Sequence, residues 1–458
     1  MKGIVTNKNT IPILSCVLIE VLDNQIRING TDLNIWSISQ IEASETKIQG
    51  SFVVHLKTLS NAVRIATNEL KFEVVETFDA NDKEVLTLNL TSGGTLKIEA
   101  VNAEQFPIMP ELNKKSDTYK IQNEVWQDFI QKTVFAITKE SGRFTLDGLA
   151  CEFGKKGLRV ISIDGHRLSL AETSDFEANK ISKLELLPLD AVKFLQKINC
   201  DGKIKIDNNN FYFELENRII FARKLTGTFP NYEMVIPKEN DFEVKFYLQD
   251  LLKVLNQAKP FVNKSYHSIG LQPYNNNLII KTINSESELI QKIVCDFPNY
   301  ESLALMFDLN YLIDVLASFK GNQLMTLKFT NNSIQPLFEA SVNDNDYKFV
   351  IMSQAAIKKD SPEEKLFQIL SDDEKKELPM MEFVLPQVEN PTVAKSVSKT
   401  IPLTSKLRPA DKSQIVGEIE TILQAMRQCV MSNNLAQEFV SLFGKTIDVM
   451  STKLEMVK

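Results

Sequence analysis

Few side chains in this sequence have the types and spacing that catalysis needs. Among 458 residues there are three histidines and five cysteines. An acid–base pair is conceivable at Asp164-Gly165-His166, where an imidazole lies two residues from a carboxylate. A lone histidine beside a glycine turn is more often structural, so we prefer that interpretation. The sequence also lacks HExxH, GxSxG and a Gly-rich phosphate loop ending in Gly-Lys-Ser/Thr.

The cysteines do not form a metal or disulfide pattern. They lie far apart, with no CxxC pair, at Cys16, Cys151, Cys200, Cys295 and Cys429. Zinc sites and disulfide frameworks of small domains need cysteines at short, paired spacing. We therefore expect reduced thiols, no metal, no cofactor, a non-enzymatic role and a cytoplasmic location.

The composition is that of a folded protein without a membrane span. Hydrophobic residues make up 43% and charged residues 24%, which argues against global disorder. The longest apolar stretch, residues 11–22, contains Pro12 and Glu20 and is too short to cross a bilayer. The first residues contain no hydrophobic run typical of a secretion signal. Because 52 basic and 59 acidic residues give a net charge of -7, the protein is not basic overall, but one basic face is possible.

One pattern occurs three times in the chain: a run of alternating apolar residues, a polar turn and a second such run. The copies cover residues 17–33, 149–166 and 269–285, and each pattern is typical of a β-hairpin. If Asp32, Asp164 and Ser285 are equivalent, the copies are 164 − 32 = 132 and 285 − 164 = 121 residues apart. This recurrence indicates a repeated domain, and the chain length also predicts about three domains.

Apolar residues at helical spacing surround these hairpins. They predict helices within residues 125–136 and 248–259, ahead of the second and third copies. A further helix is expected after each copy, at residues 56–66, 188–198 and 308–320. The first copy has no room for the preceding helix.

The alternation of hairpins and helices predicts an α+β fold of three similar domains. Their expected boundaries are residues 1–111, 112–238 and 239–356. Residues 379–413, rich in Pro, Ser, Thr and Lys, are typical of a linker. The extension at 357–458 ends in two amphipathic segments that predict a helical hairpin. Because such a pair must cover its apolar faces, we expect an interaction or oligomerisation module.

Several motifs now occur in a recognisable order. They include Asn9-Thr10-Ile11-Pro12-Ile13-Leu14-Ser15, Thr31-Asp32-Leu33, Phe144-Thr145-Leu146-Asp147-Gly148, Asp164-Gly165-His166-Arg167-Leu168 and Phe229-Pro230-Asn231-Tyr232. Over residues 3 to 355 the sequence resembles the bacterial β sliding clamp of DNA polymerase III. The resemblance implies DNA-clamp domains that form a head-to-tail dimeric ring. Helices would line the inside of this ring, and antiparallel sheets would form its outside. It also implies double-stranded DNA, bound without sequence preference, a replicative polymerase and a clamp loader as partners.

The resemblance assigns basic residues of the inner helices, and a few loop residues, to DNA. These are Lys8, Lys57, Arg64, Lys132, Arg143, Phe144, Lys193, Lys197, Lys253, Lys259 and Lys320. The alternative for the lysines is an ordinary solvated helix face. Asp190 stands where many relatives have a basic residue.

A cleft for partner peptides is implied between the second and third domains. Its residues would be Leu146, Gly165, His166, Arg167, Leu168, Pro230, Met234, Val235, Tyr266, Asp308, Tyr311, Val350, Ile351 and Met352. Met234 replaces a residue that is commonly basic. The usual Met-Pro-hydrophobic-Arg ending is here Ile351-Met352-Ser353-Gln354-Ala355. We still expect a peptide such as Gln-Leu-Ser-Leu-Phe to bind.

Ring closure is expected to join Leu96 and Ile98 of one protomer to Phe261 and Val262 of the other; packing in the protomer's own core is the alternative. Only eight residues precede Asn9, so either the start lies upstream or the first domain lacks a strand and a helix.

Two alternatives to a simple clamp follow from the ends of the chain. A clamp-derived interaction protein, such as one encoded by a mobile element, would recruit or sequester replication factors without encircling DNA. Separately, Phe439-Val440-Ser441-Leu442-Phe443 weakly resembles clamp-binding peptides. One hypothesis is that it occupies the protein's own cleft and blocks clients, although we prefer a helix core stripe for it.

Overall fold

The structure of the protein is a computed structural model. It describes residues 1, 3–5, 11–47, 49–65, 70–78, 84–90, 95–99, 103–111, 116–138, 144–154, 157–176, 184–298, 304–330 and 334–354. The chain divides into two compact units, Met1–Phe383 and Val384–Lys458. The predicted extension at 357–458 lies outside the described residues. Among those that are described, no helix has the length and apolarity to cross a membrane.

Antiparallel strands dominate the described part of the chain. The strands are β1 (Cys16–Leu22), β2 (Gln25–Thr31), β3 (Ile35–Glu42), β4 (Gly50–His55), β5 (Leu70–Phe78), β6 (Glu84–Leu90), β7 (Thr95–Glu99), β8 (Asp117–Ile121), β9 (Gly148–Gly154), β10 (Gly157–Ile163), β11 (Arg167–Thr173), β12 (Leu184–Pro188), β13 (Gly202–Ile206), β14 (Asn210–Leu215), β15 (Arg218–Arg223), β16 (Phe242–Tyr247), β17 (Ser268–Tyr274), β18 (Asn277–Ile283), β19 (Glu288–Val294), β20 (Leu305–Asp308), β21 (Leu324–Phe329), β22 (Leu337–Val342) and β23 (Asn345–Ile351).

Two of the four sheets run continuously from one domain into the next. The order β4-β1-β2-β3-β15-β14-β13-β8 joins the first and second domains, because β3 pairs with β15. The order β12-β9-β10-β11-β23-β22-β21-β16 joins the second and third through β11 and β23. The remaining sheets, β5-β6-β7 and β19-β18-β17-β20, end in β7 and β19, which have no second partner strand among the described residues. Backbone pairing therefore fixes both junctions between domains.

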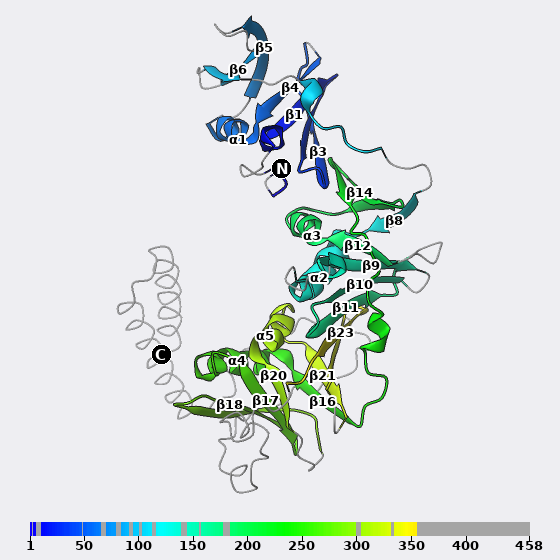
Figure 1. Ribbon diagram of the computed structural model, residues 1–458, viewed down its shortest axis with the longest axis vertical. Helices are drawn as coiled ribbons and strands as arrows, with labels where there is room; N and C mark the ends of the chain where they lie inside the picture. The colour runs from blue at the N-terminus through cyan, green and yellow to red at the C-terminus, as the bar shows by residue number, and fades with distance from the viewer. Residues whose placement is uncertain are drawn as a thin grey trace, which may run out of the picture. The chain divides into compact units, whose positions relative to one another are not determined.

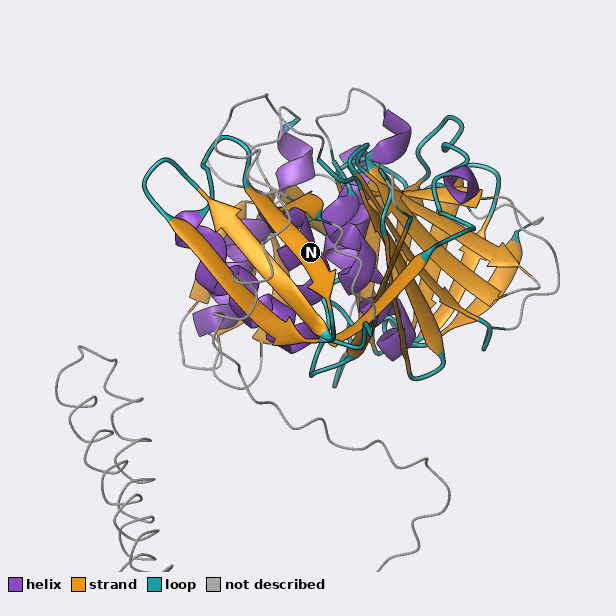
Figure 2. Ribbon diagram, turned by 90° about the horizontal axis from the view of Figure 1, so that it is seen from below, coloured by secondary structure: helices purple, strands orange, loops and turns teal. Residues whose placement is uncertain are grey.

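The helices lie where the sequence predicts them. They are α1 (Leu56–Ile65), α2 (Asn123–Thr133), α3 (Leu189–Leu195), α4 (Leu248–Ala258) and α5 (Leu309–Ala317). Helices α3 and α5 each begin one residue later and end three residues earlier than predicted. In the third domain α4 packs against α5 (Figure 1). Figure 2 shows the helices gathered against the faces of the orange sheets.

The three-fold repeat is visible in the turns of the hairpins. The Asp32 carboxylate accepts hydrogen bonds from the amides of Asn34 and Ile35, at 2.9 and 2.7 Å. Asp164 accepts from the amides two and three residues further on, at 2.9 Å each. In the third copy Asn284 does the same, at 2.8 and 2.7 Å. The residue equivalent to Asp164 is thus Asn284, whereas we predicted Ser285. The spacing between the second and third copies is therefore 284 − 164 = 120 residues.

An unbroken apolar core extends through the second and third domains. It holds the aromatic rings of Trp126, Phe213 and Phe349, none of them exposed. The first domain has a smaller core that includes Val17, Phe52 and Leu59. Cys16, Cys151, Cys200 and Cys295 are buried free thiols, as predicted, and Cys429 lies outside the described residues.

Candidate functional site

Three of the predicted partner residues, Leu146, Leu168 and Val350, lie together on one face of the sheet that joins the second and third domains. The other face carries α2, because Ser162 and Ser169 donate hydrogen bonds to carbonyls at its end, each at 2.5 Å. Since side chains alternate along a strand, Leu168 and its cross-strand partner Val350 point to the face opposite α2. There they pack with Leu146 in a separate apolar cluster. We call this face, with the loops around it, the partner surface.

Buried residues form the floor of the partner surface, and exposed residues lie around it. Leu146, Leu168 and Val350 are at most 3% exposed. Met234, by contrast, is 79% exposed and Tyr266 is 39% exposed. Gly165 and His166 are also exposed, and Pro230, Val235, Asp308, Tyr311 and Met352 are partly exposed. Exposed apolar side chains beside a buried apolar floor are what a short apolar peptide needs for binding.

Ile351 is a correction to the predicted set. It is fully buried and belongs to the main core on the helix-bearing face. It follows Val350 in β23, so alternation turns it away from the partner surface. Ile334, which was not among the predicted cleft residues, is 65% exposed, and its carbonyl accepts a hydrogen bond from the Ser353 amide at 2.8 Å. An isolated isoleucine in a loop gives no sequence signal of this placement.

Arg167 is bound by the protein's own groups. Its Nε lies 2.8 Å from Asp164 Oδ2, and its Nη1 lies 2.8 Å from Asp314 Oδ2 of α5. The guanidinium lies 4.4 Å from the ring centroid of Tyr311, which also stacks with His166 at 6.0 Å. Burial, followed by the nearby carboxylates, raises the pKa of Tyr311, so the phenol stays protonated. Arg167 is thus an interdomain anchor at the edge of the partner surface.

The residues that replace the usual tail are firmly bonded. Met352 donates its amide to the His166 carbonyl at 2.9 Å, and Gln354 donates to the Met306 carbonyl at 2.8 Å. The Gln354 side chain accepts from the Ser268 hydroxyl at 2.7 Å and donates to the Tyr266 carbonyl at 3.1 Å. A glutamine therefore fixes the Tyr266 loop beside the partner surface.

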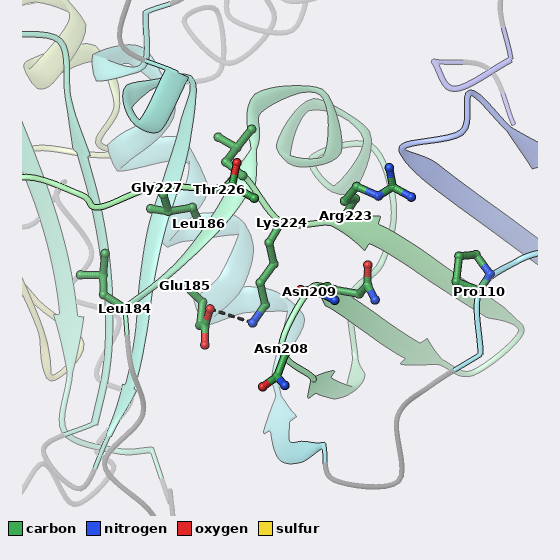
Figure 3. A pocket seen from close by; sticks show the side chains of 12 residues that line it. Pro110, Leu184, Glu185, Leu186, Asn208, Asn209, Arg223, Lys224, Thr226 and Gly227 are labelled. Carbon is green, nitrogen blue, oxygen red and sulfur yellow. Dashed lines mark hydrogen bonds and ion pairs between the residues drawn. The ribbon is translucent and has the colours of Figure 1, made fainter.

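A separate hollow of about 500 Å³ lies near the start of the second domain (Figure 3). Pro110 and β12 line it, together with the turn between β13 and β14. Lys224, a buried lysine, pairs there with Glu185 at 2.7 Å. None of the predicted site residues lines this hollow.

Most of the predicted DNA-contacting side chains that the structure describes are exposed on or beside helices. These are Lys57, Arg64, Lys193, Lys197, Lys253, Lys259 and Lys320.

Lys132 is a correction to the predicted DNA-contacting set. It is 4% exposed, pairs with Asp128 and lies 4.7 Å from the ring centroids of both Phe319 and Tyr347. Its ammonium is therefore part of the junction with the third domain. Lys8, Arg143 and the Phe144 side chain lie outside the described residues.

The residues predicted for ring closure differ in exposure. Ile98 is 5% exposed within the core of the first domain, and Val262 is 7% exposed within the main core. The core alternative therefore holds for both in the single chain. Phe261 is 37% exposed, and the side chain of Leu96 lies outside the described part. On the edge strand β19, Gln291 Oε1 is buried without a hydrogen-bond partner among the described residues.

Three repeated α+β domains joined by two continuous antiparallel sheets define the class of DNA clamps. The descriptions "DNA polymerase III beta subunit, N-terminal domain", "central domain" and "C-terminal domain" match residues 1–110, 120–231 and 233–355. The chain belongs to the DNA polymerase III beta subunit family.

Individual relatives agree with this family. The chain is 27% identical over 357 residues to the beta sliding clamp of Haemophilus influenzae, covering 76% of this chain and 94% of the relative. It is 27% identical over 349 residues to that of Pseudomonas putida, covering 75% and 93%. The crystal structure of the Pseudomonas aeruginosa DNA polymerase III subunit beta superposes with a TM-score of 0.71 at 22% identity, covering 77% of this chain and 95% of that one. The Bacillus subtilis sliding clamp gives a TM-score of 0.69 at 20% identity, with 77% and 94% covered.

Proposed function

We propose that this chain is a processivity factor, a sliding clamp that encircles duplex DNA and tethers a replicative polymerase. Its membership of the beta subunit family is the observation that carries this function. The proposed role is mechanical, without a catalytic step, and is exercised in the cytoplasm. Enclosure of the DNA would hold the protein in place, so no tight contact is required.

Ring closure by a second copy is supported by the outer edges of β19 and β7, which pair with no second strand in the described part of the chain. The junctions inside the chain are made by β3 with β15 and by β11 with β23. In the repeat, β19 corresponds to β3 and β11. Strand β7 is the last of β5-β6-β7, as β15 and β23 are the last of the runs β8-β13-β14-β15 and β16-β21-β22-β23. Pairing of β19 with β7 of another protomer would repeat the same junction and cover both edges. Two copies would then close a head-to-tail ring of six domains.

Phe261 supports the same arrangement. In the second domain, Phe135 follows α2 and stacks on Phe349 of β23, with centroids 6.3 Å apart. Phe261 lies in the short 3-10 helix Lys259–Phe261 that follows α4 in the third domain, and it is 37% exposed. A partner strand against β19 would give this ring the neighbour that Phe135 already has.

The exposed lysines on the helices would face the DNA. Lys193 and Lys197 lie four residues apart on or just after α3, a spacing that puts both on one helical face. Lysines contact phosphates as mobile point charges and carry no sequence information. Weak, sequence-independent attraction is what a sliding protein needs. The partner surface, in turn, would bind short apolar peptides of the polymerase and the clamp loader.

The decisive experiment is retention on nicked circular DNA, with the protein loaded by its cognate loader. A clamp stays on the circle through high salt and leaves when the circle is linearised, because only topology holds it. Equal loss from both forms would contradict encirclement. If client peptides still bound in that case, a protein that sequesters replication factors would be the better assignment.

A further inference from the structure

Residues 230–235 border the partner surface and have little backbone support. The segment contains a short helix, η5 (Tyr232–Met234). Its hydrogen bonds are local, from the Met234 amide to Asn231 and from the Val235 amide to Tyr232, at 3.4 and 3.0 Å. Residues 226–240 make no backbone hydrogen bond to another described segment. Side chains must therefore set the position of this segment.

Tyr232 is the main anchor of the segment. Its ring is 7% exposed and packs in the apolar cluster under the partner surface. Its hydroxyl donates to Glu152 of β9 at 3.1 Å and accepts from Arg159 Nη1 of β10 at 3.3 Å. The same Nη1 lies 3.4 Å from Glu233. One guanidinium thus bonds two consecutive residues of the segment, immediately before Met234.

Arg159 is itself held from the other side by a row of charges that crosses the domain junction. Its Nε lies 3.0 Å from Glu172 Oε2 of β11, and Glu172 Oε1 lies 2.7 Å from Lys348 Nζ of β23. We call Glu152, Arg159, Glu172 and Lys348 the charge ladder. Lys348 lies two residues before Val350, so both point to the partner-surface face. The ladder therefore links the strand that carries Val350 to the segment that carries Met234.

We propose that Arg159 is a positioning residue that holds segment 230–235 as one side of the partner surface. It contacts no client itself. A guanidinium suits this task because its fork of donors can bond several acceptors in fixed directions at once. Loss of Arg159 frees the segment, so a client must order it on binding, and that ordering weakens the complex. This role rests on the proposed peptide-binding function.

The first measurement is hydrogen exchange of the full-length protein without any peptide. In Arg159→Met, the amides of Met234 and Val235 are expected to exchange about tenfold faster or more, while exchange in the core strands and the melting temperature stay near wild type. The matched control is Lys328→Met, which removes a cross-strand partner of Glu339 (2.7 Å) from the same sheet. Exchange at Met234 and Val235 equal in Arg159→Met and Lys328→Met would overturn the proposal.

The second measurement is fluorescence polarisation with a labelled Gln-Leu-Ser-Leu-Phe peptide. Arg159→Met and Tyr232→Phe are each expected to weaken binding about fivefold, a loss near 1 kcal/mol. The double variant should be no weaker than either single one, because both break the same anchor. Additive losses would contradict a shared anchor. If Arg159→Met folds poorly, Tyr232→Phe, which keeps the ring, provides the same test.

The two measurements separate this role from the proposed function. Absence of peptide binding by the wild-type protein would contradict peptide binding by the partner surface. Exchange at Met234 and Val235 needs no peptide, and faster exchange in Arg159→Met would still support the positioning of the segment.

Discussion

Arg167 of β11 and Asp314 of α5 form an ion pair across the junction of the second and third domains, with Nη1 2.8 Å from Oδ2. The guanidinium also donates to the Phe135 carbonyl at 2.6 Å and stacks on Tyr311. Its side chain is only 9% exposed. Because so many partners fix one orientation, this arginine holds α5 against the strand that carries the partner surface.

Arg167→Met is expected to destabilise the protein by about 2 kcal/mol, because it leaves the largely buried Asp164 without its cation. This loss of stability is smaller than that for a fully buried ion pair, because the side chain of Asp314 is 44% exposed. Urea unfolding followed by tryptophan fluorescence would measure the change. Asp314→Asn, the control at the exposed partner, should cost less than about 1 kcal/mol. An Arg167→Met protein as stable as the wild type would refute an anchoring role.

Lys132 and the exposed pair Lys193 and Lys197 should behave differently toward DNA. Replacing both exposed lysines by alanine is expected to weaken binding to linear duplex several-fold. The slope of log K against log salt concentration should fall by the amount that corresponds to up to about two lost phosphate contacts. Lys132→Met should change neither quantity, because its ammonium is enclosed by Asp128 and two rings. Titrations at several salt concentrations test this. A reduced salt slope in Lys132→Met would return that residue to the DNA-contacting set.

Phe261→Asp is expected to give monomers in light scattering while each protomer stays folded, since the ring is partly exposed in the single chain. Ile98→Asp would be a poor probe, because Ile98 lies in the core with Val17 and Phe52. A buried, unpaired carboxylate there would unfold the first domain. Circular dichroism distinguishes the two effects. A Phe261→Asp protein that remains dimeric would contradict the assigned interface.

Stability should fall at alkaline pH through the buried thiols. Burial raises the pKa of Cys200 and of Cys295 from 9.0 to about 12. Between these values the unfolded chain releases protons that the folded chain keeps, so it binds fewer protons and stability falls as pH rises. Each thiol contributes a slope on the order of 1 kcal/mol per pH unit in this window.

Cys200→Ala should make the alkaline decline shallower, as measured by urea unfolding from about pH 8 to about pH 11. Ile204→Val, a nearby core change without a titrating group, should lower stability evenly at every pH. If the slope of Cys200→Ala matched that of Ile204→Val, the thiol would not be the cause.

Local patterns in the sequence determined the repeated units of this protein. The alternation around Asp32 and Asp164 specified hairpins, and the spacing of Leu248, Leu251 and Leu255 specified a helix, because these periods depend only on neighbouring residues. The lysines were identified on the predicted helices, whereas the floor of the partner surface, Leu168 and Val350, was predicted from the family resemblance alone.

The tertiary structure alone decided which partners those residues meet. The ammonium of Lys132 is enclosed by Tyr347 and its neighbours, and Ile351 points to the core rather than to the partner surface. Arg159 contacts Tyr232, which lies more than seventy residues further along the chain. Periodicity shows which side of an element is apolar, but not which distant element covers it. Contacts of that kind depend on the pairing of β11 with β23, which no local pattern encodes.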